Sequence, residues 1–186
     1  MTSRPIRCLS RAAVSCVLLI IIAGCGPQTA PEPEVVAVQL ETVENSELRL
    51  RLVDVPADFA VTANEGSNLV LGHADPAIGG TIVIVARPPE DGQNLPSAVK
   101  FHGAFIENQE DGEYQGGQEL VSQLGTAFYS RGHFVLDGES VEETMIFTLH
   151  PDADRMLTLR YRYPAGVDSS VRVQQLFDVL ATVNGL

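Results

Sequence analysis

Few residues in this chain have types and spacings that support chemistry, and the sequence singles out Cys25. It follows a stretch of three aliphatic or small residues, Ile22, Ala23 and Gly24. A deprotonated cysteine thiol is a nucleophile, and small side chains before it leave room for a peptidase at the adjacent peptide bond. Positive charge precedes the apolar run at Arg4, Arg7 and Arg11. The predicted chemistry is therefore a modification of Cys25 during export.

The segment resembles a bacterial lipoprotein signal peptide whose lipobox is Ile22, Ala23, Gly24 and Cys25, with Ile22 where Leu is usual. This resemblance implies that the Cys25 thiol is diacylated, the bond before it is cut, and the new amine is acylated. The apolar positions 12–24 are too few for a permanent membrane span, which needs about 20 residues. An ordinary secretory signal peptide or an uncleaved anchor are the alternatives.

The same segment sets the predicted domain organisation and location. Residues 1–24 are predicted to be the signal peptide, residues 25–36 the acylated cysteine with a proline-rich tether, and residues 37–186 a globular α+β domain. Gly26 replaces the Asp that favours retention at the inner membrane in such lipoproteins. We therefore expect a lipid anchor in the cell envelope, on the periplasmic side of the outer membrane if the cell has one.

Net charge excludes one class of partner. Without its first 24 residues the chain keeps nine basic and 24 acidic side chains, a net charge of −15. Such a charge repels the phosphates of nucleic acids and of anionic lipid surfaces. No nucleic-acid partner is expected, and the membrane partner is expected to be held through the lipid anchor.

No other motif predicts catalysis, a metal or a cofactor. The four histidines, His73, His102, His133 and His150, have no pair at metal-ligand spacing. Ser130 lies near His133, but a catalytic triad depends on geometry that proximity in sequence does not give. The acidic residues of 107–113 are expected to form a solvated loop, with calcium binding as the alternative. Asp152 and Asp154 are expected to lie in a hairpin turn.

The periodicity predicts an α+β domain with a central, mainly antiparallel sheet flanked by helices. Helices are expected over 94–109 and from Asp168 to Asn184-Gly185, with Val173, Leu176, Phe177 and Leu180 as the apolar stripe of the second. Asp137-Gly138 predicts a hairpin turn, and residues 81–86 predict a central strand covered on both faces. The other strands are expected at 35–40, 47–53, 59–62, 69–71, 118–124, 126–130, 133–136, 141–150 and 155–163, with a loop over 107–117.

This order of elements is similar to the PsbP/Mog1-like α/β/α sandwich. Residues 50–59 resemble its opening strand and turn, with Phe59 where Trp is usual, and residues 156–163 with 171–183 resemble its closing strand and helix. The resemblance spans about 48–186. It implies a fold used for binding and assembly rather than catalysis, and it transfers no catalytic residues.

Four arginines suggest a docking surface. Arg49, Arg51, Arg160 and Arg162 fall on the polar faces of two predicted strands. If the strands lie close together, the arginines form a basic stripe for an anionic partner. Cross-strand pairing with Glu47, Glu142 or Glu143 is the alternative.

The sequence therefore predicts a lipid-anchored, non-enzymatic binding or assembly factor of the cell envelope, with an envelope protein as its partner. A lipoprotein carrier whose sheet holds an apolar ligand is the second hypothesis. An envelope hydrolase has no motif to support it.

Overall fold

The computed structural model describes residues 42–186 except 76–77, 91 and 153. The predicted signal peptide, the lipobox with Cys25, the tether and the predicted strand at 35–40 lie outside the described residues. The described part begins with strand β1, Thr42–Asn45.

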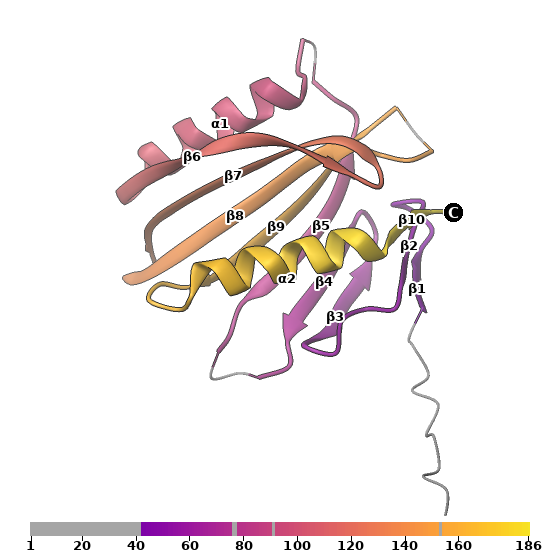
Figure 1. Ribbon diagram of the computed structural model, residues 1–186, viewed down its shortest axis with the longest axis horizontal. Helices are drawn as coiled ribbons and strands as arrows, with labels where there is room; N and C mark the ends of the chain where they lie inside the picture. Colours follow the sequence, from indigo (N-terminus) through magenta and orange to yellow (C-terminus); the bar gives the residue numbers. More distant parts are fainter. Residues whose placement is uncertain (1–41, 76–77, 91, 153) are drawn as a thin grey trace, which may run out of the picture. The chain divides into compact units, whose positions relative to one another are not determined.

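Seven antiparallel strands form one long sheet in the order β3-β4-β5-β9-β8-β7-β6 (Figure 1). Their bounds are β3 Phe59–Glu65, β4 Asn68–His73, β5 Thr81–Arg87, β6 Glu110–Ser122, β7 Gly125–Leu136, β8 Glu139–Leu149 and β9 Met156–Pro164. A second, three-stranded sheet has the order β1-β2-β10, with β2 Leu50–Val53 and β10 Val183–Gly185. The helices are α1, Leu95–Glu107, and α2, Ser169–Thr182. The predicted α+β class, with a mainly antiparallel sheet and two helices, is confirmed.

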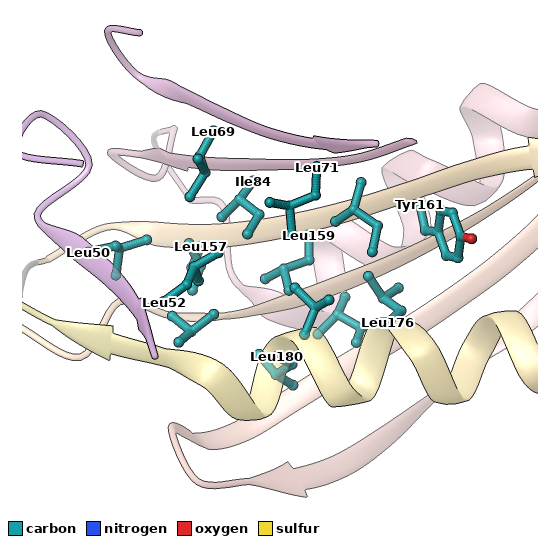
Figure 2. Packing of buried hydrophobic residues seen from close by; sticks show 14 of the residues in the cluster. Leu50, Leu52, Leu69, Leu71, Ile84, Leu157, Leu159, Tyr161, Leu176 and Leu180 are labelled. Atoms are coloured by element: carbon teal, nitrogen blue, oxygen red, sulfur yellow. The ribbon is translucent and has the colours of Figure 1, made fainter. Parts of the chain in front are cut away.

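The main core lies between the long sheet and the layer formed by α2 and the small sheet. Leu157, Leu159 and Tyr161 of β9 belong to the same buried cluster as Leu50 and Leu52 of β2. Figure 2 shows these side chains facing Leu176 and Leu180 of α2. Because side chains alternate along a strand, this packing directs the intervening residues of β9 to the opposite face of the sheet.

On that opposite face, α1 contacts β6, β7 and β8 (Figure 1). The helix begins with a capping box in which Asn94 accepts from the Ser97 amide at 2.9 Å and Ser97 Oγ accepts from the Asn94 amide at 2.8 Å. Gly103 lets the helix approach β6, since a Cβ there would lie 3.1 Å from the Tyr114 ring. Neither described helix is long and apolar enough to cross a membrane.

The prediction was wrong for β6 and β7. The expected loop over 107–117 is the end of α1 and the first half of β6, and the two strands expected over 126–136 are one strand, β7. The register of β6 on β7 shifts twice, between Glu110 and Glu113 and between Tyr114 and Gly116. Asp111 has φ 51° and Gly116 has φ 98° at these shifts. Such β-bulges interrupt the alternation from which a strand is recognised.

Two further corrections concern the ends of the domain. Arg49 has φ 57° and lies in the turn between β1 and β2, so the expected strand over 47–53 begins only at Leu50. Helix α2 ends at Thr182 rather than at Asn184-Gly185, because residues 183–185 pair with β2 as β10. Leu176 and Leu180 are buried as expected, but Arg172 and Gln175 are buried beside them, joined by a hydrogen bond of 2.8 Å.

Strand β5 is covered less than expected. Ile82, Ile84 and Ala86 are buried in the main core, whereas Val83 and Val85 point to the other face and are partly exposed. Helix α1 packs mainly on β6, β7 and β8 on this face, and Val83 and Val85 of β5 stay partly exposed there. An apolar part of the sheet therefore remains open to solvent.

We expect Leu159→Ala to lower the free energy of unfolding by about 2–5 kcal/mol, because it leaves a cavity in the main core. Leu149→Ala, at the exposed end of the neighbouring strand β8, is the matched control and should change it by less than about 0.5 kcal/mol. Urea unfolding followed by circular dichroism measures both. Equal effects of the two substitutions would contradict this packing of the core.

Candidate functional site: a groove beside helix α1

The open half of the sheet forms a groove with two adjoining hollows, which we call the α1 groove. The first hollow has a volume of about 320 Å³, and its floor is built by side chains of β5, β8 and β9. The second, of about 280 Å³, lies between β8, β9 and α1. Both hollows are lined by Gln93, Met145, Phe147 and Arg160. These volumes are close to the lower end of the range for small-molecule sites.

The second hollow of the α1 groove is largely apolar, whereas the first is lined by apolar and polar side chains in similar measure. Val83, Val85 and Met156 line the first hollow, and Phe101 and Phe105 of α1 line the second. Phe101 is 65% exposed and Phe105 is 44% exposed, which is unusual for aromatic side chains on a helix that packs on a sheet. The groove thus exposes apolar surface on the helix and on the sheet that face the same space.

A network of buried polar side chains lies beneath α1, next to the second hollow. His102 Nδ1 is 2.7 Å from Ser130 Oγ, and His102 Nε2 is 3.1 Å from Glu143 Oε1. The other carboxylate oxygen of Glu143 accepts from Arg162 Nε at 2.9 Å and from its terminal nitrogen. The network therefore ties α1 to β7, β8 and β9.

The network sets the ionisation of Glu143. Burial alone would raise the pKa of this carboxyl, but the hydrogen bond to His102 and the charge and hydrogen bonds of Arg162 outweigh it. Together they hold the pKa of Glu143 below its ordinary value of 4.5. Glu143 is therefore an ionised, fully paired carboxylate at neutral pH.

Ser130, His102 and Glu143 have the order of hydrogen bonds found in a serine–histidine–acid triad. A triad acts only if substrate reaches the serine oxygen, and Ser130 has 0% exposure beneath α1. The arrangement therefore fits the docking of α1 on the sheet and not nucleophilic attack. The proximity of Ser130 to His133 in the sequence did not predict a triad, and His133 Nε2 lies 3.8 Å from Glu113. The chain carries no local signal for the pairing with His102, because the two residues lie 28 positions apart.

The four predicted docking arginines do not form one stripe. Arg51 lies on β2 of the small sheet, and Arg160 and Arg162 lie on β9 of the long sheet. The leucines of β2 and β9 face the same core from its two sides. Because side chains alternate along a strand, Arg51 points outward on the side of the small sheet, and Arg160 and Arg162 point outward on the side of the long sheet. Arg49 lies in a turn. Arg162 forms the expected cross-strand pair with Glu143, whereas docking by the other arginines stays a prediction.

The other predicted sites have simpler outcomes. Of the expected acidic loop 107–113, the residues Glu110, Asp111 and Glu113 belong to β6. Within the described residues, no group of three His, Cys, Asp or Glu side chains is placed to hold a metal ion. Ile22, Ala23, Gly24 and Cys25 lie outside the described part.

Comparison with known proteins supports the fold. Neither a protein-family model nor a curated protein sequence matches this chain. Among solved structures, the chain is similar to the Ran-binding protein Mog1p of Saccharomyces cerevisiae, with 14% identity over 78% of this chain and 94% of that one, at a TM-score of 0.55. It is also similar to the PsbP protein CyanoP of Synechocystis, with 11% identity over 89% of this chain and 99% of that one, at a TM-score of 0.51.

A third similar structure is LpqN of Mycobacterium tuberculosis, described as involved in cell envelope biogenesis. Identity is 17% over 73% of this chain and 83% of that one, and the TM-score is 0.50. At these identities the comparisons establish the fold alone. The described domain has the PsbP/Mog1-like fold that the sequence predicted.

The lowered pKa of Glu143 gives a testable dependence of stability on pH. The stabilisation that ionised Glu143 provides is complete above the ordinary pKa of 4.5. It is lost as the pH falls through the lower pKa that Glu143 has in the folded protein. Glu143→Gln should therefore reduce stability at neutral pH and make the loss of stability below about pH 5 shallower. Urea unfolding between about pH 3 and pH 7 measures this.

The control is Glu139→Gln, which changes an exposed carboxylate at the start of the same strand. It should leave the acid dependence of stability as in the unsubstituted protein. An unchanged slope in Glu143→Gln would show that the network does not hold this carboxylate ionised.

Proposed function

We propose that this protein is a lipid-anchored lipoprotein of the cell envelope that acts by non-enzymatic binding, as a binding or assembly factor. The observation that carries the proposal is the α1 groove, an open surface with apolar side chains in both hollows, on a fold whose triad-like serine is buried beneath α1. An accessible surface beside a serine that is itself buried supports binding rather than hydrolysis by this network. The likeness to Mog1p, named as a Ran-binding protein, and to LpqN is consistent with this role.

The case for the anchor comes from the sequence. Cys25 ends a basic and apolar leader, and the proline-rich segment after it suits a tether. Each buried methylene contributes about 0.8 kcal/mol and stable anchoring needs more than one chain, so three acyl chains at Cys25 would hold the protein at a bilayer. The net charge of −15 in the remaining chain gives the domain no electrostatic attraction to anionic lipids.

A carrier of apolar ligands is the second candidate function. It is favoured by Val83, Val85 and Met145, which leave apolar side chains on the sheet partly open to solvent. An apolar ligand in the groove would remove this surface from water at about 25 cal/mol per Å². The carrier hypothesis differs from the assembly hypothesis in what occupies the groove.

The anchor is tested with Cys25→Ser. We expect this variant to lose incorporation of radioactive palmitate and to leave the membrane fraction, because the acylated thiol is absent. Cys16→Ser removes a cysteine from within the predicted signal peptide and is the matched control, which should be labelled and sediment normally. Palmitate labelling of Cys25→Ser, or its unchanged membrane attachment, would contradict lipid anchoring at this residue.

The binding role is tested by crosslinking in living cells. A photoreactive amino acid at Phe101, on the wall of the α1 groove, should give a discrete adduct with an envelope component. The same amino acid at Val121, which is 86% exposed on β6, is the control and should give none. If adducts form equally from both positions, or from Val121 alone, the groove is not the binding surface.

A further inference from the structure

We propose that the α1 groove binds an amphiphile with an acyl chain and an anionic head group, with Arg160 pairing the head group. This inference rests on the carrier function and names its ligand class. Three observations support it. Of two arginines on one face of β9, one is paired among the described residues and the other is not; apolar side chains line the groove; and the strands beneath it already hydrogen-bond to one another.

Arg160 and Arg162 lie two residues apart on the same face of β9, but their surroundings differ. Arg162 faces Glu143 across the strands and is paired with it. Arg160 faces Val83 of β5 and Met145 of β8, so its strand neighbours are apolar. Among the described residues, Arg160 has no hydrogen bond or ion pair. Its guanidinium therefore keeps donors free for an anion.

Arg160 is also partly buried, and it lines both hollows. Removing a cation from water without a partner is unfavourable, so an anion that supplies the missing bonds is favoured there. Two carboxylates also line the groove. Glu143 is committed to His102 and Arg162 through its two oxygens, and Glu90, like Arg87, is an exposed side chain that lines the first hollow. Arg160 is thus a cation that lines both hollows in a chain of strongly negative net charge.

The floor of the groove favours an acyl chain over a peptide. It is the face of a sheet, where β5, β9 and β8 already use their backbone groups to pair with one another. An extended peptide on this face would place its own amides against Val85 and Met145 without partners, at a cost for each one. An acyl chain has no such groups to satisfy.

The second hollow offers the acyl chain apolar contacts next to Arg160, from Phe101, Phe105 and Phe147. The arrangement matches an amphiphile, with apolar side chains in both hollows beside Arg160, which has no partner among the described residues. A carboxylate and a phosphate head group share the chemistry that the arginine recognises.

The methionines provide a direct test. The chain has three, Met1, Met145 and Met156, and the last two line the first hollow. The full chain carrying Cys25→Ser, so that it has no acyl groups of its own, is labelled at its methionine methyls and titrated with laurate below its micelle concentration. We expect the signals of Met145 and Met156 to shift and that of Met1 to stay. Monolaurin, with the same chain and a neutral head group, should bind about tenfold or more weakly.

Three variants complete the experiment. Arg160→Ser should weaken laurate binding about tenfold or more and leave monolaurin unchanged, because a charged hydrogen bond is lost. Arg51→Ser removes the same charge from the opposite side of the domain and should change neither. Phe101→Ser, at a side chain exposed enough to leave folding intact, should weaken both ligands. Dodecyl phosphate in place of laurate distinguishes a phosphate head group from a carboxylate.

Equal binding of laurate and monolaurin, unaffected by Arg160→Ser, would overturn the anionic head group. No shift of Met145 or Met156 with any of the ligands would overturn the inference and the carrier function together. A protein adduct from Phe101 in cells without any amphiphile binding would identify a protein as the occupant. The binding role itself would then stand, since it is judged by the crosslinking alone.

Discussion

The alternation of side chains along β9 is the constraint on which the rest of the structure depends. Leu157, Leu159, Tyr161 and Tyr163 all turn into the main core, and each is 0% or 1% exposed. A register slip of one residue would move all four to the other face. Because α2 and the small sheet pack on these side chains, the same constraint places Arg160 and Arg162 on the opposite face, where α1 lies.

Helix α1 covers only part of that second face, and buried hydrogen bonds attach the helix to the sheet. Helix α1 lies on β6, β7 and β8, where His102 links Ser130 and Glu143. Small residues bring the surfaces together, since a Cβ at Gly132 would lie 2.8 Å from the Ile106 side chain. The groove lies beside the helix because α1 packs mainly on β6, β7 and β8, whereas Val83 and Val85 of β5 remain partly exposed.

The elements that sequence predicted best are those whose pattern is local. The alternation of β9 and the turn at Asp137-Gly138, with φ of 53° and 82°, needed no tertiary information. Strand β6 was missed because two bulges interrupt its pattern. The pairing of His102 with Ser130 and Glu143 was missed because strand register brings together residues from three elements. The four arginines do not form the expected single stripe, because β2 and β9 belong to different sheets. Alternation predicts which residues share a face of a strand but not which sheet the strand joins.

The two arginines of β9 lie on one surface, but only Arg162 is paired among the described residues. Arg162 can be partly buried because Glu143 is ionised opposite it, and Glu143 can be ionised because His102 and Arg162 share its charge. Two residues along each strand, Arg160 faces Met145 instead of a glutamate, and it has no hydrogen bond or ion pair among the described residues. The pairing of β8, β9 and β5 places Arg160 between Val83 and Met145. A side chain placed by strand register before a ligand arrives would lower the cost of the binding proposed above.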